Sequence, residues 1–226
     1  STLDGLRRGL RHERVGETAM NSLLLAGSAA LLAVALALLL TEAGQGRPRL
    51  DRLLLVGSFV PVAVPPMSMA VGWVTFWGTG GPGHLGGEPL PDQRLGPALL
   101  LAARLLPFAT FAVRAVRRRL APELQDAAAM AGLGPAGRFA RVTLPLVAPG
   151  AALGFVLAFL FGLREVDALV FTRTGSETLP VQLYNMIHYG YDVQVAGLSF
   201  LWTAGVGVFL VLTALVYGSR FRIAAS

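Results

Sequence analysis

The sequence predicts an all-α integral membrane protein with five transmembrane helices. Of its 226 residues, 54% are hydrophobic and only 14% are charged, and the mean hydropathy is +0.61. A soluble domain usually carries about 25% charged residues. The apolar residues also form long runs, and a run of about 18 residues is enough to cross the hydrocarbon core of a bilayer. A lipid bilayer is therefore the expected environment.

The charges support the same interpretation. All 19 basic residues are arginine, and the net charge is +6 with an isoelectric point near 10.9. The arginines lie mostly between the apolar runs, where positive charge orients membrane proteins. We therefore expect no nucleic-acid partner. Cysteine is absent, which excludes disulfides, thiol nucleophiles and thiolate metal sites.

The first two predicted spans differ in composition. The first, residues 21–40, consists almost wholly of leucine, alanine and valine. The second, residues 53–77, contains prolines, which remove backbone donors and should kink the helix. These prolines are Pro61, Pro65 and Pro66. Trp73 and Trp77 near its end are typical of anchors at the membrane interface.

Three more spans are predicted at residues 95–116, 144–163 and 195–217. Glycines in the last two would let neighbouring helices approach closely. They are Gly150, Gly154, Gly205 and Gly207. We expect a single transmembrane domain over residues 1–226.

The loops predict which side of the membrane each segment faces. Residues 117–142 are rich in arginine and should be cytoplasmic, together with the arginine-bearing loop at 47–52 and the C-terminal tail. Residues 78–96, a Gly- and Pro-rich loop, and residues 165–192 then fall on the outer side. Five spans also place residues 7–14 outside, although this segment holds four arginines.

Residues 117–142 have the composition of two short helices joined by a tight turn. Pro122 suits the first turn of a helix, and residues 123–131 are mostly strong helix formers. Two glycines that follow can end that helix, and Pro135 suits the start of the second. Three residues would share one face of the first helix: Leu124, Ala128 and Ala131.

This segment resembles the cytoplasmic loop in permease subunits of binding-protein-dependent ABC importers. The family pattern is Glu-Ala-Ala, three residues, Gly, nine residues, then Ile-x-Leu-Pro. Here it is represented by Asp126, Ala127, Ala128, Gly132, Val142, Leu144 and Pro145. Asp replaces Glu and Val replaces Ile, while every spacing is kept. Since the whole pattern lies between apolar spans, the resemblance is specific, and it covers about residues 21–217.

The resemblance implies a type I (MetI-like) ABC importer permease with a cytoplasmic coupling helix, multi-pass in the bacterial cytoplasmic (inner) membrane. Such a chain is not an enzyme. It forms the translocation path and docks its coupling helix on a separate ABC ATPase subunit, which binds ATP and Mg, so this chain needs no cofactor of its own. The other implied partners are a periplasmic or lipid-anchored substrate-binding protein and a second permease domain. The residues expected to contact the ATPase are Leu124, Asp126, Ala127, Ala128, Met130, Gly132, Leu133 and Gly134.

A second resemblance runs through residues 163–185. Ferric-iron-type permeases have, after the fourth span, an acidic residue, a short apolar stretch, a glycine and a Thr-Leu pair. The matching positions are Glu165, residues 168–171, Gly175, Thr178 and Leu179. The resemblance implies ferric iron as the solute, while a polyamine, thiamine or a phosphorylated sugar stay open. Such permeases are often two fused halves, and this chain starts at Ser1, so we expect one half of a fused permease.

Ionisable residues in or near spans are candidates for the path. Arg104 lies well inside the third span and needs a partner or a water-lined face. Glu165 could line the route of a cation. The interpretation that we favour for Glu165 and Asp167 is pairing with Arg164 at the interface.

No catalytic or metal site is predicted. His12, His84 and His188 are isolated in the sequence, and a phosphate-binding P-loop needs the lysine that this chain lacks. The rival interpretations are an ATP-independent secondary transporter or channel subunit, and a membrane anchor with no path. The former would need internal repeats with polar, broken helices at the midplane.

Overall fold

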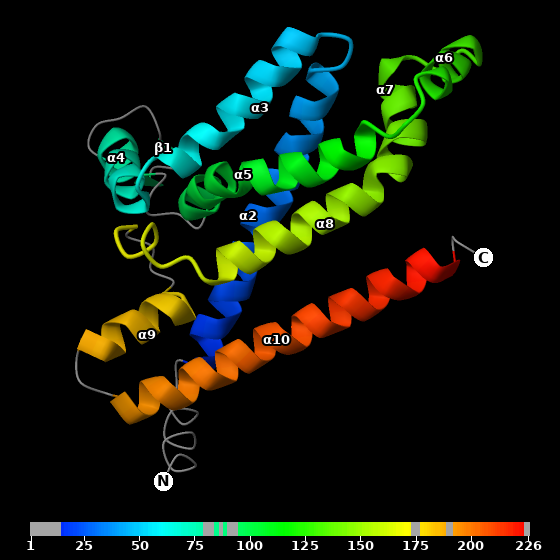
Figure 1. Ribbon diagram of the computed structural model, residues 1–226. Coiled ribbons are helices and arrows are strands. Elements are labelled where there is room, and N and C mark those ends of the chain that lie inside the picture. The colour runs from blue at the N-terminus through cyan, green and yellow to red at the C-terminus, as the bar shows by residue number, and fades with distance from the viewer. Residues whose placement is uncertain are drawn as a thin grey trace. The chain divides into compact units, whose positions relative to one another are not determined.

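The computed structural model describes residues 15–78, 84–85, 88–89, 95–172, 177–188 and 192–223. Over these residues the chain is almost entirely helical (Figure 1), which confirms the predicted all-α class. The elements are α2 (Val15–Ala43), α3 (Pro48–Ala63), α4 (Pro66–Gly78), β1 (His84–Leu85), β2 (Glu88–Pro89), α5 (Leu95–Arg117), α6 (Glu123–Met130), α7 (Pro135–Arg138), the π-helix η2 (Phe139–Thr143), α8 (Leu144–Leu163), α9 (Leu179–His188) and α10 (Asp192–Ile223). The strands β1 and β2 form one short antiparallel pair.

Four helical segments of the described residues are long and apolar enough to cross a membrane by themselves. They are Val15–Ala43, Leu95–Arg117, Pro135–Leu163 and Val195–Leu215. They match the predicted first, third, fourth and fifth spans, although the fifth was predicted to run two residues further, to residue 217. Helices α3 and α4 pass the same test together, but they meet at an angle of 95°.

The predicted second span is therefore two helices, and the expectation of one kinked helix over residues 53–77 is wrong. Helix α3 ends at Ala63, and the backbone of its C-cap residue Val64 is extended (ψ 132°). A residue before proline is disfavoured in the helical conformation, and Pro65 follows. The next bond of the α4 ladder runs from the Met69 N–H to the Pro65 oxygen at 3.0 Å. The break thus follows from two consecutive prolines, which remove two consecutive helical hydrogen bonds.

The chain falls into two compact units, residues 22–176 and residues 1–21 with 177–226. In the first unit, α5 lies against α8 along most of its length (Figure 1). Gly150 and Gly154 of α8 permit this contact, as predicted. A Cβ placed on Gly150 would lie 2.7 Å from the Ala112 oxygen, and one on Gly154 would lie 3.1 Å from the Ala109 Cα. Glycine is required at these two positions because the helix backbones themselves meet.

Helix α2 contributes a stripe of small side chains to the same unit. The buried residues at helical spacing are Ala26, Ala29, Ala30, Ala33 and Ala37. Near the end of α8, a Cβ on Gly162 would lie 3.3 Å from the Ala26 Cβ. Helix α4 packs differently, through a buried cluster of Ala70, Leu100 and Ala168 that Trp73 covers. Trp73, predicted as an interface anchor, thus also packs against this cluster.

The second unit contains the start of α2, α9 and α10. Leu179, Met186 and Leu198 form its core. Thr18 Oγ1 donates to Gln182 Oε1 at 2.7 Å, and Asn21 Nδ2 donates to the Glu177 oxygen at 3.3 Å. Helix α9 is a finding, because no helix was predicted within residues 165–192.

The close helix contacts predicted for two glycines of the fifth span are not found, and other predictions concern residues outside the described ranges. Among the described atoms, none lies within 4 Å of a Cβ placed on Gly205 or Gly207. Those glycines make no close helix contact there. Residues 1–14, most of the Gly-rich loop and Gly175 lie outside the described residues.

Candidate functional site

The short helix α6 carries most of the residues predicted to contact a partner. Pro122 forms its N-cap, and the helix ends in a Schellman motif. The Leu133 N–H donates to the Ala128 oxygen at 3.1 Å, and the Gly132 N–H donates to the Ala129 oxygen at 3.0 Å. Gly132 has φ +80°, a conformation that favours glycine over other residues. The predicted turn at Gly132 is confirmed.

One side of α6 faces the protein and the other faces outward. Of the three residues predicted to share a face, only Ala128 is buried. The opposite side presents Asp126, Ala127 and Met130, all exposed, with Met130 at 84%. An exposed methionine among alanines gives a flat, adaptable surface suited to another protein.

Helix α6 is fixed to the membrane helices at both ends. After Gly134, Pro135 opens α7 as predicted, and η2 leads directly into α8. Gln125 Nε2 donates to the Oγ1 of Thr143 at 3.0 Å, and Thr143 is only 1% exposed. The hydroxyl of Thr143, which lies between Val142 and Leu144 of the sequence pattern, thus anchors α6.

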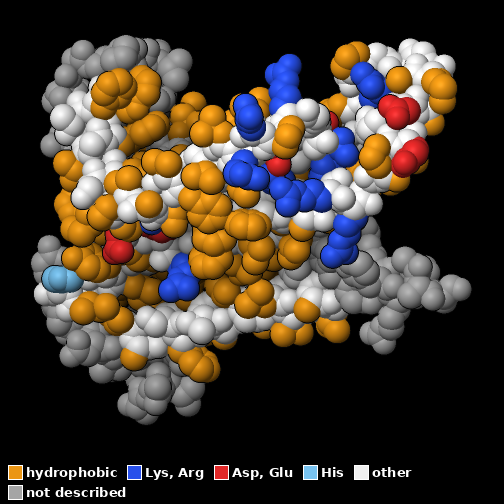
Figure 2. Space-filling model, turned by 45° about the horizontal axis from the view of Figure 1, so that its top comes forward, with side chains coloured by type: hydrophobic (Ala, Val, Ile, Leu, Met, Phe, Trp, Pro, Cys, Tyr) orange, Lys and Arg blue, Asp and Glu red, His pale blue; other side chains and the backbone are white. Residues whose placement is uncertain are grey.

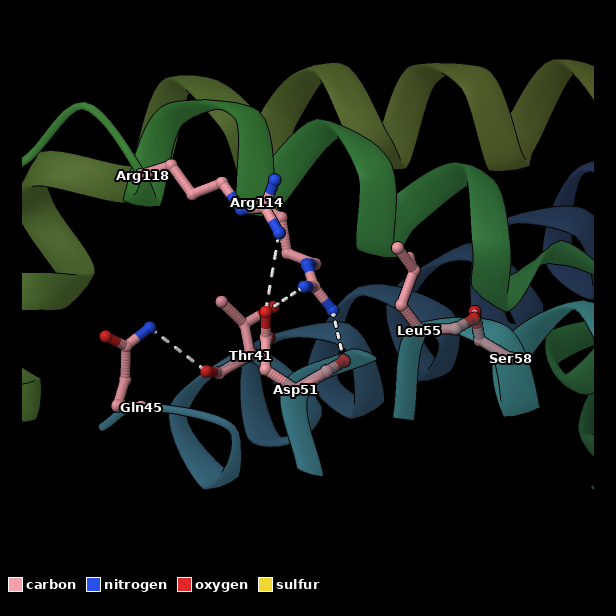
Figure 3. Close-up of polar contacts among 7 residues, drawn as sticks. All are labelled: Thr41, Gln45, Asp51, Leu55, Ser58, Arg114 and Arg118. Atoms are coloured by element: carbon pink, nitrogen blue, oxygen red, sulfur yellow. Dashed lines mark hydrogen bonds and ion pairs between the residues drawn. The ribbon is translucent and has the colours of Figure 1, made fainter. Parts of the chain in front are cut away.

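A cluster of arginines occupies the end of α5 beside α6. Arg114 donates to the Asp51 carboxylate and, at 2.9 Å, to the Asp51 backbone oxygen (Figure 3). Arg117 Nε pairs with Glu42 Oε1 at 2.9 Å. The exposed Arg118 also reaches Asp51 at 3.4 Å. Figure 2 shows arginine side chains gathered at this end of α3 and α5, while apolar side chains cover the neighbouring surface.

The second polar cluster surrounds Arg104, in the first half of α5. Its Nη1 donates to the Pro61 and Val64 oxygens, both at 3.3 Å, and its Nε lies 3.8 Å from Glu165 Oε1. In a continuous helix the Pro61 oxygen would accept from residue 65, which is proline and has no N–H. Arg104 therefore supplies donors at the break in the second span, where carbonyl oxygens lack helical partners.

The predicted pathway residues Arg104 and Glu165 are thus brought together. The favoured pairing of Glu165 with Arg164 is corrected, since Glu165 pairs with Arg104 and Arg164 is exposed. A cavity of about 350 Å³ lies beside the pair, lined in part by Phe108, Phe161 and Asp167. The choice of partner follows from the packing of α5 on α8, which brings the end of α8 to Arg104.

Four residues of the arginine cluster were not predicted as functional: Glu42, Asp51, Arg114 and Arg117. A sequence signal existed, because two acidic residues flank an arginine-rich loop and two arginines close an apolar span. Among the described residues, no group of three or more His, Asp or Glu could hold a metal ion.

Comparison with known proteins places these features in a family. Residues 29–225 match the family described as "Binding-protein-dependent transport system inner membrane component". The molybdenum transport system permease protein ModB of Mycobacterium tuberculosis is 32% identical over 166 residues, which cover 68% of this chain and 60% of that protein. The putrescine transport system permease protein PotI of Escherichia coli is 29% identical over 92 residues, 40% of this chain and 33% of that protein. The chain therefore matches at most 60% of the length of these two curated relatives.

A solved structure shares the fold. A chain of the bacterial alginate ABC transporter, solved with an alginate pentasaccharide-bound periplasmic protein, superposes with a TM-score of 0.69 at 19% identity. The match covers 94% of this chain and 81% of that chain. It confirms the predicted type I permease fold.

Proposed function

Because the chain belongs to the family of binding-protein-dependent transport system inner membrane components, we propose that it is the permease subunit of an ATP-driven importer. The family is one of transport components, in agreement with the prediction that the chain itself is not an enzyme. In this proposal the membrane helices form the translocation path. Helix α6 and the turn after it receive the motion of a separate ATPase.

The geometry of α6 is the observation that carries the coupling role. The helix projects from the end where α5 stops and α8 begins (Figure 1), and its exposed side holds small side chains around Met130. A surface of this kind lets another backbone approach closely. Its attachment to both α5 and α8 means that a push on α6 moves two membrane helices.

The proposed partners follow from the same role. Two ATPase subunits would bind ATP and Mg, and a periplasmic or lipid-anchored binding protein would deliver the solute. A second permease domain, or the other half of a fused chain, would complete the path. ATP binding would then shift the assembly between inward- and outward-facing states, because the ATP-bound ATPase subunits make better contacts with one of these states than with the other.

Ferric iron is the solute that the segment after α8 suggests, and Arg104 with Glu165 are the residues that we place on its path. The names of the relatives supply two alternatives, molybdenum and putrescine. Uptake of ferric iron, molybdate and putrescine should therefore be compared in vesicles that contain the assembled transporter. Uptake of either alternative without iron would overturn the iron assignment and leave the permease role intact.

The coupling role is tested by blocking the exposed side of α6. Ala127→Trp adds a large side chain to an exposed helical position, so folding should be little affected. We expect co-purification of the ATPase with the full chain to fall about tenfold, because overpacking a close contact costs roughly 1–3 kcal/mol. Gly132 is less suitable, since any side chain there is strained by φ +80°.

Ala43→Trp is the matched control. Ala43 is also exposed and ends α2 on the predicted cytoplasmic side, but it lies outside α6. Equal ATPase recovery with both variants would refute docking through α6. Solute uptake by the chain without any ATPase would instead support the secondary transporter, the rival that the broken α3–α4 span favours.

A further inference from the structure

One face of α5 holds α3 along its whole length. The residues of this face recur at helical spacing: Arg104, Phe111, Arg114 and Arg118. The Phe111 ring meets Phe59 of α3 edge to face, with centroids 5.5 Å apart. Arg114 and Arg118 bind Asp51 near the start of α3, and Arg104 binds the carbonyl oxygens at its end. Helix α3 is thus held to α5 at its start, middle and end.

The turn between α2 and α3 is shaped around its acidic residues. Gly46 has φ +68°, and the Asp51 N–H donates to the Arg47 oxygen at 2.9 Å. A Cβ on Gly44 would lie 2.7 Å from Asp51 Oδ1, so glycine is needed there to make room for the carboxylate. The turn therefore presents Asp51 to α5 in a fixed position.

The two ion pairs of this turn are largely shielded from water. The side chains of Arg114 and Arg117 are 6% and 8% exposed, whereas that of Arg118 is 68% exposed. A buried guanidinium that loses its carboxylate is strongly destabilised, while an exposed pair contributes little. The turn and the end of α5 should therefore stay together during any motion of the helices.

Helix α6 follows α5 in the chain through residues 118–122 and packs against α7 and η2. A cavity of about 590 Å³ separates α6 from the turn between α2 and α3, with Glu42 and Gln45 on one side and Gln125 and Asp126 on the other. The helical bonding of α5 extends to Arg118, whose N–H donates to the Arg114 oxygen at 3.0 Å, and a turn follows, in which the Leu120 N–H donates to the Arg117 oxygen at 3.2 Å. A displacement of α6 is thus passed to α5 and from there, through the arginines, to α3.

We infer that Glu42 and Asp51 are coupling residues: through Arg117 and Arg114 they transmit the displacement of α6 to α3 and its 95° break. The inference rests on the proposed coupling through α6 and adds the route by which the motion reaches the second span. The ion pairs of both acidic residues run to α5, so each acts as a positioning residue.

The test replaces Glu42 and reads transport and ATP hydrolysis in the same assembled transporter. In vesicles with the ATPase and binding protein, Glu42→Gln should leave ATPase co-purification intact and reduce solute uptake per ATP hydrolysed about tenfold, the size of a typical coupling energy. The swap of Glu42→Arg with Arg117→Glu should recover much of that ratio. A purely structural ion pair would change the amount of assembled transporter but not the ratio.

Arg118→Gln is the matched control, because Arg118 contacts the same turn from an exposed position. Its ratio should stay within about twofold of wild type, as expected for an exposed ion pair. An unchanged ratio in Glu42→Gln would overturn the inference, and so would a lower yield of transporters that work normally per ATP. Failure of the Ala127→Trp test would instead refute the coupling role of α6 itself, so the two failures are distinguishable.

Discussion

Arg104 combines two roles that are usually separate in membrane helices. Its guanidinium satisfies carbonyl oxygens at a helix break, and it also balances the charge of Glu165. A charged side chain within a span is costly unless such partners are present. Arg104 therefore stabilises both the break between α3 and α4 and the carboxylate of Glu165 in the wall of the neighbouring cavity.

Removal of Arg104 should destabilise the folded chain. Arg104→Met leaves the Pro61 and Val64 oxygens without the Arg104 donor and removes the positive charge beside Glu165, which keeps the Ala168 N–H as a donor. We expect the free energy of unfolding in mixed micelles to fall by about 2 kcal/mol. Adding Glu165→Gln should recover about 1 kcal/mol of this loss, measured by a double-mutant cycle. Arg164→Met is the control. Because Arg164 is exposed and only neighbours Glu165 in the sequence, its replacement should change the free energy of unfolding by less than about 0.5 kcal/mol. Independent, additive effects of the Arg104 and Glu165 substitutions would contradict the pairing.

The sequence was sufficient to select Arg104 and Glu165 but not to pair them. Both stand out because ionisable groups are rare in apolar runs. Arg164, the immediate neighbour of Glu165, was the natural partner by proximity in the sequence. The actual partner depends on how α5 and α8 dock, which is decided by Gly150 and Gly154 at the contact and not by any feature of Glu165 itself.

At the scale of elements, the pair formed by α5 and α8 is the rigid part of the first unit. The backbones meet where Gly150 faces the Ala112 oxygen and the Val116 side chain. Packed interiors do not deform gradually when atoms are added. The pair is therefore expected to move as one body.

Gly150→Ala tests that packing. The new Cβ would lie 2.7 Å from the Ala112 oxygen, so α5 and α8 must separate, at an expected cost of about 1–3 kcal/mol. The thermal unfolding midpoint in detergent should fall. Gly27→Ala in α2, where no described atom lies within 4 Å, should leave it unchanged or raise it, because alanine favours the helix by about 1 kcal/mol. An equal response of the two variants would show that the α5–α8 contact is looser than described.

Length and hydropathy predicted the long helices well, because a span must be long and apolar whatever its neighbours are. The same criteria missed α9, whose ten residues are too few for a span. The prolines of the second span predicted a kink where the structure has a break. The angle between α3 and α4 depends on which donors satisfy the freed carbonyl oxygens, and the prolines do not specify those donors. That role belongs to Arg104, which is remote in the sequence.

At the scale of the whole molecule, the ion pairs decide how the bent α3–α4 pair should be counted. Asp51 near the start of α3 binds the end of α5, while Ala70 of α4 packs against Leu100 near the start of α5. The bent pair thus carries the chain from one end of a spanning helix to the other. We therefore expect the bent pair to serve as one span, which would bring the candidate spans among the described residues to the five that the sequence predicts.

Five spans make a definite prediction of sidedness. The chain has no cysteine, so single cysteines can be placed at Gln45, Met130 and Tyr184, all of which are exposed. Without the ATPase, an impermeant maleimide should label Gln45→Cys and Met130→Cys from the cytoplasmic side and Tyr184→Cys from the outer side. Bound ATPase should protect Met130→Cys only. Labelling of Gln45→Cys and Met130→Cys from opposite sides would contradict both the ion pairs and the span count.

The junction at Val64 and Pro65 has a lasting consequence for how the molecule can move. Two adjacent rings without amide hydrogens prevent the helices on either side from merging into a straight rod. Motion at this junction therefore consists of a change in the angle between α3 and α4, with both helices kept intact. A path beside the junction can open and close without folding or unfolding of the backbone.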